Sequence, residues 1–226
     1  MKRLWITRTS PGADDTAVRL RALGFEPIVA PVLEVRFVPA DIDLSDVGAL
    51  AFTSANGVRA FAAASDARGL PTFTVGDATG RAARLAGFRD VISASADVGG
   101  LAATLTSDAR DIHGSVLHPG AAEQAGDLVG ALLRAGLGAR AVTLYETVAK
   151  AVPAELMAEV GSLHGVLVYS PRAGRRLADL LSATQAPALN AYCLSPAVAA
   201  SLRGLDIGPV VTAALPDEDA LLSLLS

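Results

Sequence analysis

The chain has 226 residues, which is enough to bury one large hydrophobic core or two modest ones. About half of the residues are hydrophobic and only 4% are aromatic, a composition typical of a folded protein whose helices pack closely on a parallel sheet. The net charge of −4 excludes attraction of nucleic acid or anionic lipid through bulk electrostatics, so an acidic ligand must be bound by local contacts.

The sequence also bears on the compartment in which the protein works. Its apolar runs are broken by Gly, Pro or charged residues, and none approaches the roughly 20 residues that a membrane span requires. Arg8 follows the apolar start of the chain too soon for a signal peptide. Cys193 is the only cysteine, which excludes an intrachain disulfide and a thiolate metal cluster. We therefore expect a cytoplasmic protein.

In chain order, short apolar runs that end at Ser, Thr, Gly or Pro alternate with longer stretches in which apolar residues have helical spacing. The expected strands cover residues 3–8, 49–54, 72–76, 90–94, 115–120, 165–170, 188–195 and 208–213. The expected helices cover residues 12–25, 55–65, 77–88, 98–109, 121–137, 172–182 and 196–205. This alternation predicts an α/β protein with parallel sheets and right-handed crossovers.

Two extended segments, residues 27–39 and 139–153, interrupt the alternation, and each ends in a proline. They enclose a run of complete β/α units, which suggests that the chain crosses twice between two α/β lobes. We expect a discontinuous first domain at residues 1–34 and 150–226, and a second domain at residues 38–144. Two hinge linkers, residues 33–38 and 144–150, are expected to form a two-stranded β linker. Alternatively, both segments are edge strands with charged outward faces.

Internal similarity supports the two lobes. Aligning "FTSANGVRAF" with "VYSPRAGRRL" places Ser54 against Ser170, and aligning "VGDATGRA" with "LSPAVAAS" places Gly76 against Ser195 at nearly the same spacing. The sequence therefore predicts two flavodoxin-like lobes that arose by internal duplication.

Polar or small residues follow several of the expected strands. They are Thr53, Ser54, Asn56, Gly76, Ser170 and Ser195. In open parallel sheets, ligands bind beyond the carboxyl ends of strands, where helix N-termini present unpaired N–H groups. Each of these residues could serve only as a helix cap. Their matching positions in two lobes favour a shared anionic ligand, a carboxylate or a phosphate.

Signatures of common cofactor and metal sites are missing. "GDATG" at residues 76–80 lacks the spacing of a dinucleotide or phosphate-loop fingerprint. The histidines stand apart, without metal-ligand spacing, at His113, His118 and His164. We therefore expect neither a cofactor nor a metal. The acidic residues at 14–15 and 217–219 are typical of helix starts rather than of catalytic pairs.

Taken together, the motifs resemble the uroporphyrinogen-III synthase family over essentially the whole chain. The matching stretches are "WITR", "LRALGFEPIVAPVLEV", "FTSANGVRAF", "TVGDATGRAARLAGF", "LHPG", "LLRAGLGARAVTLYET" and "VYSPRAGRRLADLL". The resemblance implies two α/β lobes joined by a two-stranded linker, with the active site in the cleft. It also implies conversion of hydroxymethylbilane into uroporphyrinogen III, with loss of water, ring closure and inversion of ring D, and without a cofactor or metal.

The resemblance also implies substrate contacts in both lobes. In "FTSANGV", Thr53, Ser54 and Asn56 match the ligand-facing turn of the second lobe, and in "VYSPRAG", Ser170 and Pro171 match its counterpart in the first lobe. These residues are expected to bind carboxylates of the substrate.

Two further residues match family positions near the substrate. Arg8 in "ITR" matches an arginine that could pair with a carboxylate, although a surface salt bridge is the alternative. Tyr145 in "LYET" matches a linker tyrosine that faces the cleft, so its phenol could protonate the departing hydroxyl as a general acid. Its alternative role is packing in the hinge.

The sequence departs from the family pattern at "SPAVA". Many members read approximately Gly-Pro-Thr-Thr-Ala there, whereas this chain has Ala197 and Val198 in place of the two threonines, and Ser195 in place of the glycine. A mechanism that needs those threonines is therefore in doubt for this chain, while binding through backbone N–H groups is unaffected.

Other functions stay open at this point. One is a hinge-closing two-lobed module that binds a small anion or a tetrapyrrole without catalysis. Another is a sugar-phosphate isomerase or transferase, which would need a general base that the sequence does not place near the loops. The expected partners are hydroxymethylbilane and, in a transient hand-over, hydroxymethylbilane synthase. Neither nucleic acid nor a membrane is expected to bind, and we expect a monomer because no exposed heptad pattern occurs.

Overall fold

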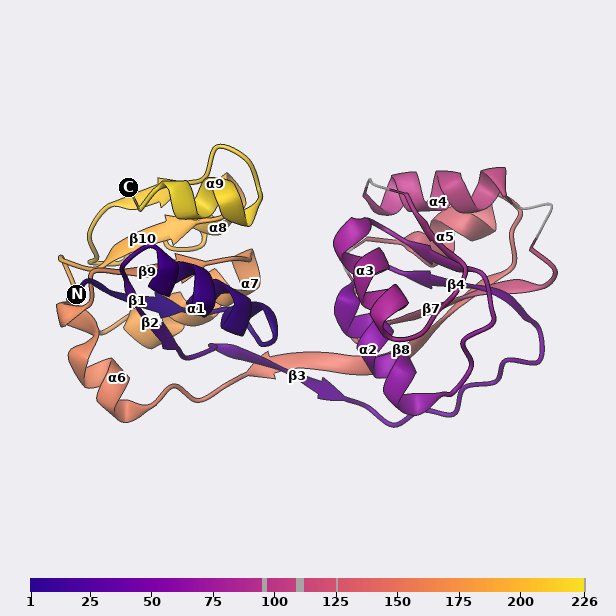
Figure 1. The fold of residues 1–226 in the computed structure, drawn as a ribbon, viewed down its shortest axis with the longest axis horizontal. Helices are drawn as coiled ribbons and strands as arrows, with labels where there is room; N and C mark the ends of the chain where they lie inside the picture. Colours follow the sequence, from indigo (N-terminus) through magenta and orange to yellow (C-terminus); the bar gives the residue numbers. More distant parts are fainter. Residues whose placement is uncertain (95–96, 109–111, 125, 226) are drawn as a thin grey trace. The chain divides into compact units, whose positions relative to one another are not determined.

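The computed structural model describes residues 1–94, 97–108, 112–124 and 126–225. The chain forms two compact units. Unit 1 contains residues Met1–Glu34 and Val148–Ser226, and unit 2 contains residues Val35–Thr147. Each unit is an α/β structure with helices on both faces of its sheet, as Figure 1 shows. The predicted fold class is therefore confirmed.

Unit 1 contains a parallel five-stranded sheet in the order β11-β10-β9-β1-β2. Its strands are β1 (Arg3–Ile6), β2 (Glu26–Val29), β9 (Gly165–Val168), β10 (Asn190–Cys193) and β11 (Val210–Thr212). Its helices are α1 (Gly12–Ala22), α6 (Ala154–Glu159), α7 (Pro171–Leu181), α8 (Pro196–Ala200) and α9 (Glu218–Ser223), with a 3-10 turn at Val160–Ser162 after α6.

The core of unit 1 lies on the two faces of this sheet. Because side chains alternate along a strand, Trp5 points to one face and its neighbours Leu4 and Ile6 point to the other. The Trp5 face packs on α6, α7 and α8, and the opposite face packs on α1 and α9. Trp5 is fully buried, and its indole N–H donates to the Ala30 carbonyl oxygen at 2.6 Å. Both faces of the sheet are therefore covered.

Unit 2 contains most of a six-stranded sheet in the order β3-β8-β7-β4-β5-β6, since the start of β3 and the end of β8 belong to unit 1. Its strands are β3 (Leu33–Phe37), β4 (Val47–Phe52), β5 (Thr72–Thr74), β6 (Val91–Ser93), β7 (Ser115–Ala121) and β8 (Ala139–Ala149). Its helices are α2 (Ala55–Ala64), α3 (Asp77–Leu85), α4 (Val98–Ser107) and α5 (Leu128–Arg134). Leu50 and Phe52 pack under α2 and α3, whereas Ala49 and Ala51 pack under α4 and α5.

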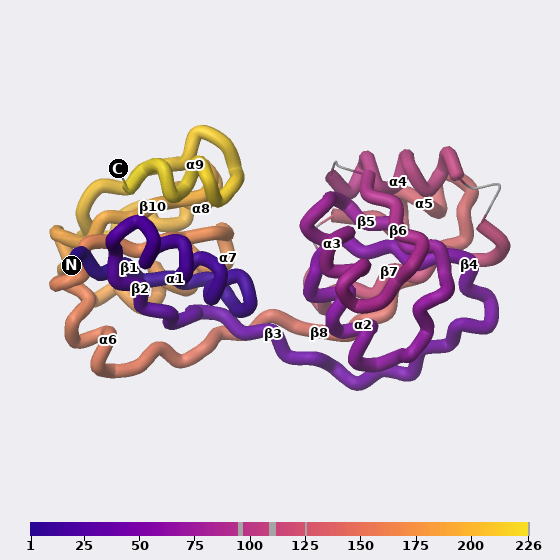
Figure 2. Tube along the Cα trace, in the orientation of Figure 1, coloured from indigo at the N-terminus to yellow at the C-terminus, as the bar shows by residue number. Residues whose placement is uncertain are grey.

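The strands from β8 to β6 are all parallel, and β3 is the exception. Val38 N–H donates to the Leu144 carbonyl at 2.8 Å, and Lys150 N–H donates to the Val32 carbonyl at 3.0 Å. The residue numbers rise along one strand as they fall along the other, so β3 and β8 run antiparallel. Figure 2 follows β3 and β8 along the Cα trace. Whether they act as a hinge stays a prediction.

Most of the predicted elements are present, and three predictions about element boundaries were wrong. The expected extended segment 27–39 is two strands, β2 and β3, which belong to different sheets. The expected helix 121–137 begins only at Leu128, because Ala121 still pairs in β7 and Asp127 caps the helix by accepting from Gly130 N–H at 2.8 Å. The expected helix 196–205 is α8 alone. Residue 109, the end of the expected helix 98–109, lies outside the described residues.

In the described parts of the chain, the helices are all too short or too polar to cross a membrane. Those same parts contain no cluster of three His, Cys, Asp or Glu side chains that could hold a metal ion.

Candidate active site

The candidate site of unit 2 lies at the carboxyl edge of its sheet. β4 ends at Phe52 and leads through Thr53 and Ser54 into α2. Tyr145 belongs to β8, where it pairs with Ala121 at the carboxyl end of β7. Because β7 lies directly between β4 and β8, this register places Tyr145 at the same edge as the β4–α2 turn.

Ser54 and Tyr145 are hydrogen-bonded to each other. Their hydroxyl oxygens lie 2.7 Å apart, and Ser54 Oγ also accepts from the Gly57 N–H at 3.1 Å as the N-cap of α2. One hydroxyl can accept and donate at once, so both contacts are satisfied together. Tyr145 is only 7% exposed, and its ring packs in the core with Leu144. The phenol is therefore held in one orientation by Ser54.

The first turns of α2 carry a polar pair that includes Arg59, a residue absent from the sequence prediction. Asn56 Oδ1 accepts a hydrogen bond from Arg59 Nη2, and both side chains are half-buried. Burial lowers the pKa of Arg59, and the nearby Tyr145 raises it. The contact with Asn56 places the Arg59 guanidinium over the first turn of α2, which Ser54 caps. The spacing of three residues in "NGVR" was the only sequence signal, because residues three apart share a helix face.

Gly76 occupies the equivalent position after β5 in the same unit. It is the N-cap of α3, with an extended backbone that any residue could adopt. A Cβ atom built on Gly76 would meet no other atom within 4 Å, so the turn has open space beside it. The carboxyl ends of β4 and β5 lie side by side, which brings Gly76 to the same edge as Thr53 and Ser54.

The predicted residues of unit 1 follow two neighbouring parallel strands. Ser170 follows β9 and caps α7, its Oγ accepting from Ala173 N–H at 3.2 Å, and Pro171 is the first residue of that helix. Ser195 follows β10 and caps α8 by accepting from Val198 N–H at 3.4 Å. Since β9 pairs directly with β10, the three residues share one edge of the sheet of unit 1.

The departure from the family pattern can now be placed. Val198 is buried at 1% exposure in the core of unit 1, whereas Ala197 is exposed at the start of α8. Neither side chain carries a hydroxyl, so Ser195 supplies the side-chain oxygen at this turn and uses it as a helix cap.

Arg8 is engaged by residues of its own unit. Its Nη1 lies 3.2 Å from Glu218 Oε1, and its guanidinium carbon lies 4.5 Å from the centre of the Tyr169 ring. Tyr169 also donates to Glu218 Oε1 at 3.2 Å, and Arg19 pairs with Glu218 Oε2 at 3.1 Å. The salt bridge weighed as the alternative for Arg8 is thus present. A role for Arg8 in binding substrate stays a prediction.

Two buried groups that resemble catalytic residues are unsuited to catalysis. Burial raises the pKa of the Cys193 thiol to about 12, so almost no thiolate forms near neutral pH. Burial also lowers the pKa of His118, whose Nδ1 lies 2.8 Å from the Ala51 carbonyl oxygen. Both side chains therefore serve the core.

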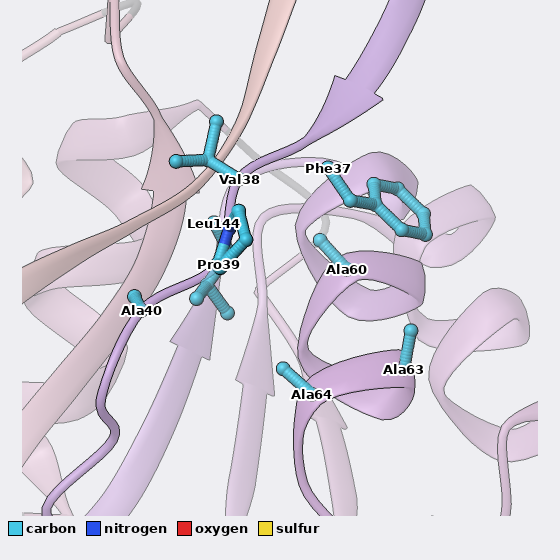
Figure 3. A pocket seen from close by; sticks show the side chains of 8 residues that line it. All are labelled: Phe37, Val38, Pro39, Ala40, Ala60, Ala63, Ala64 and Leu144. Atoms are coloured by element: carbon cyan, nitrogen blue, oxygen red, sulfur yellow. The ribbon is translucent and has the colours of Figure 1, made fainter.

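A pocket of about 380 Å³ in unit 2 is a poor candidate for the active site (Figure 3). Its lining residues come from the end of β3, from α2 and from β8, and they are Phe37, Val38, Pro39, Ala40, Ala60, Ala63, Ala64 and Leu144. None of these side chains is charged or polar, so the pocket does not suit an anionic ligand.

The contact between Ser54 and Tyr145 makes a prediction about stability. Ser54→Ala removes a helix cap and the partner of a buried phenol, so we expect unit 2 to lose roughly 2 kcal/mol. Asp97→Ala is the matched control, because Asp97 caps α4 of the same unit through Gly100 N–H at 2.9 Å. It should cost only about 1 kcal/mol. Hydrogen exchange of the amides of β4 and β7 measures both losses, and equal losses would contradict the prediction.

Comparison with known proteins identifies the family. Residues 14–223 match the family model described as uroporphyrinogen-III synthase HemD. No curated protein matches the sequence. The uroporphyrinogen-III synthetase of Helicobacter pylori 26695 superposes with a TM-score of 0.71 at 16% identity, over 100% of this chain and 98% of that one. A mutant uroporphyrinogen III synthase of Thermus thermophilus has a TM-score of 0.52 at 17% identity, over 100% and 96% of the two chains. These structures share the fold, and because the family model spans nearly the whole sequence, the chain belongs to the uroporphyrinogen-III synthase family.

Proposed function

We propose that this member of a tetrapyrrole-synthesising enzyme family is a cyclising hydro-lyase that converts hydroxymethylbilane into uroporphyrinogen III. The observation that carries the proposal is the hydrogen bond between Ser54 and Tyr145, 2.7 Å long, at the carboxyl edge of a parallel sheet. It combines a proton donor with a helix start whose N–H groups favour anions. We further propose that the enzyme works as a monomer in the cytoplasm, on hydroxymethylbilane handed over by hydroxymethylbilane synthase.

Binding would use the strand-end turns of both units. The acetate and propionate groups of the substrate are carboxylates, and N–H groups at the starts of α2 and α7 would donate hydrogen bonds to them. Thr53, Asn56 and Gly76 would line the turn in unit 2, and Ser170, Pro171 and Ser195 would line the turns in unit 1. Binding of this kind fixes the linear substrate in the shape required for ring closure, and positioning alone can supply several kcal/mol of the barrier.

The chemical step needs a proton at the leaving hydroxyl. The pyrrole nitrogen lone pair expels that hydroxyl as the C–O bond breaks, and a proton from the Tyr145 phenol converts it into water. The cationic methylene carbon then bonds to the ring D α carbon that already bears a methylene bridge, which gives a spiro intermediate. The bond from that α carbon to its original bridge breaks, the released bridge carbon bonds to the free α carbon of ring D, and loss of the proton on that carbon restores the pyrrole. That proton returns to the Tyr145 phenolate. The net change is loss of one water molecule, and Ser54 would hold the phenol in place during both transfers.

A coupled assay tests the proposal. Hydroxymethylbilane is generated in place, the protein is added, the products are oxidised, and the type I and type III uroporphyrin isomers are separated. We expect type III to dominate, because only an enzyme that inverts ring D forms it, whereas spontaneous closure in a protein-free control gives type I. If the protein yields type I alone, the proposed reaction is wrong, and a binding module without catalysis becomes the better interpretation.

A further inference from the structure

Arg59 carries a positive charge that the described part of the chain does not neutralise. It lies on α2, its side chain is half-buried, and it donates to the amide oxygen of Asn56. A guanidinium stays protonated in proteins, and burying a charge without a counter-ion is unfavourable. No described carboxylate lies within 4.0 Å of it. An anionic group placed beside this guanidinium would therefore be stabilised by its charge.

Several other arginines of the chain donate to carboxylates or to backbone carbonyl oxygens. Arg8 and Arg19 share the carboxylate of Glu218, and Arg140 pairs with Asp46 at 3.2 Å. Arg68 donates to four backbone carbonyl oxygens, among them Ala86 O at 2.8 Å. Among the residues that the structure describes, Arg59 donates only to the neutral amide of Asn56. Because its N–H groups are not occupied by a carboxylate or by backbone carbonyls in this way, the Arg59 guanidinium can donate to a ligand.

The direction of the Arg59 side chain brings its charge to the candidate site. Side chains on a helix point back toward its N-terminus, and the contact with Asn56 shows that Arg59 lies over the first turn of α2. That turn begins at Ser54, whose hydroxyl is bonded to Tyr145. The free N–H groups of the turn and the guanidinium have the same preference for an anion. A single carboxylate could therefore contact both.

We propose that Arg59 binds one carboxylate of the substrate beside Tyr145 and so positions the leaving hydroxyl at the phenol. This inference rests on the proposed function, since it takes the tetrapyrrole as the ligand. Asn56 would hold the guanidinium fork in orientation until the carboxylate arrives. The ligand class is an acetate or propionate side chain, because a planar carboxylate matches the two parallel N–H groups of the fork.

The test measures binding separately from catalysis. Uroporphyrin III, which carries acetate and propionate groups, is titrated into the whole protein and binding is followed by its absorbance. The variants are Arg59→Gln, Arg59→Lys and the control Arg89→Gln. Arg89 is an exposed arginine of the same unit that precedes β6, at the amino end of the strands. Its loss changes the net charge by the same amount as loss of Arg59.

We expect Arg59→Gln to weaken uroporphyrin III binding by about 10- to 100-fold, since a charge-assisted hydrogen bond contributes roughly 1.5 to 3 kcal/mol. Arg59→Lys should recover part of the affinity, and Arg89→Gln should bind like the unaltered protein. In the isomer assay, Arg59→Gln should raise KM and also lower kcat, because the hydroxyl is no longer aligned with Tyr145. The titration is repeated with a porphyrin analogue in which methyl groups replace the acetate groups, to show which substituent Arg59 binds. If Arg59 binds an acetate group, Arg59→Gln should no longer weaken binding of this analogue.

The outcomes separate this inference from the proposed function. If the unaltered protein makes type III product and Arg59→Gln binds and turns over like Arg89→Gln, the role of Arg59 is overturned while the function stands. If the unaltered protein makes type I alone, the function is overturned, and a loss of porphyrin affinity confined to Arg59→Gln still supports a carboxylate site at Arg59. Equal melting temperatures of the variants confirm that each one is folded.

Discussion

Tyr145→Phe is expected to lower turnover of hydroxymethylbilane to the type III isomer by about 10- to 100-fold, the low end for loss of a general acid. The effect is at the low end because the pyrrole nitrogen already expels the hydroxyl. The substitution removes one oxygen from a side chain that is 7% exposed and leaves its packing in place. KM should therefore change little. The measurement is kcat and KM in the coupled assay, with the fraction of type III product as a second readout.

Ser54→Ala distinguishes proton donation by the Tyr145 phenol from the effect of holding that phenol in position. This variant keeps the phenol but removes its hydrogen-bond partner, whereas Tyr145→Phe removes the proton itself. If Tyr145 is the acid, Tyr145→Phe lowers kcat more than Ser54→Ala does, and the double variant loses no more than Tyr145→Phe, because Ser54 acts only through the phenol. A kcat for Tyr145→Phe equal to that of the unaltered protein would leave the phenol with only a packing role.

The sequence predicted the strands well because each one is a short apolar run bounded by turn residues. The runs around Trp5, Phe52 and Val166 all became central strands with both faces covered. The segment 27–39 was harder, since its alternation continues through Pro31. Proline lacks an N–H group and cannot donate to a ladder, and β2 ends before Pro31 while β3 begins after it in another sheet.

Helix ends were the other weak point, and capping explains why. Composition alone made the whole stretch 121–137 look helical, yet the structure starts α5 only where Asp127 supplies an acceptor for Gly130. The short helix α6 was missed because its first residue follows Pro153, which was taken as the end of an extended segment. In both places a single residue, not the average of the stretch, sets the boundary.

Contacts between distant residues in the candidate site could not be read from the sequence. Ser54 and Tyr145 are 91 residues apart, and they meet only because β8 pairs with β7 in a register that places Tyr145 beside Ala121. A shift by one residue would turn the phenol to the other face of the sheet. Arg59 was overlooked for a different reason: on sequence alone it is one of many arginines, and only the structure shows its half-buried guanidinium on the amide oxygen of Asn56 over the first turn of α2.

The partner of Arg8 is the other long-range contact, 210 residues away at Glu218. The carboxylate of Glu218 accepts from Arg8, Arg19 and Tyr169, and also from Thr16 Oγ1. These groups belong to α1 and to the turns after β1 and β9, so one side chain of α9 ties three other parts of unit 1 together. Its side chain is 22% exposed, which makes the cluster partly buried.

Glu218→Ala is therefore expected to destabilise unit 1 by roughly 2 to 3 kcal/mol. Breaking a buried ion pair costs about 3 to 5 kcal/mol, and the exposure of Arg8 and Arg19 reduces that loss because water can solvate the freed guanidinium groups. The substitution also leaves the Tyr169 phenol and the Thr16 hydroxyl without their carboxylate acceptor. Urea unfolding followed by Trp5 fluorescence is the measurement, since Trp5 is the only tryptophan and is fully buried in unit 1.

Asp219→Ala is the matched control for Glu218→Ala. Asp219 is the next residue along α9 and, within the described ranges, pairs with Arg19; its side chain is 88% exposed. A pair this exposed contributes little, so we expect the unfolding midpoint to move by less than a quarter of the shift that Glu218→Ala causes. Equal midpoints for the two variants would mean that the cluster around Glu218 does not stabilise unit 1. A large shift for Glu218→Ala alone would show that the cluster to which Arg8 belongs stabilises unit 1, and a role of Arg8 in binding the substrate would then be additional to this structural role.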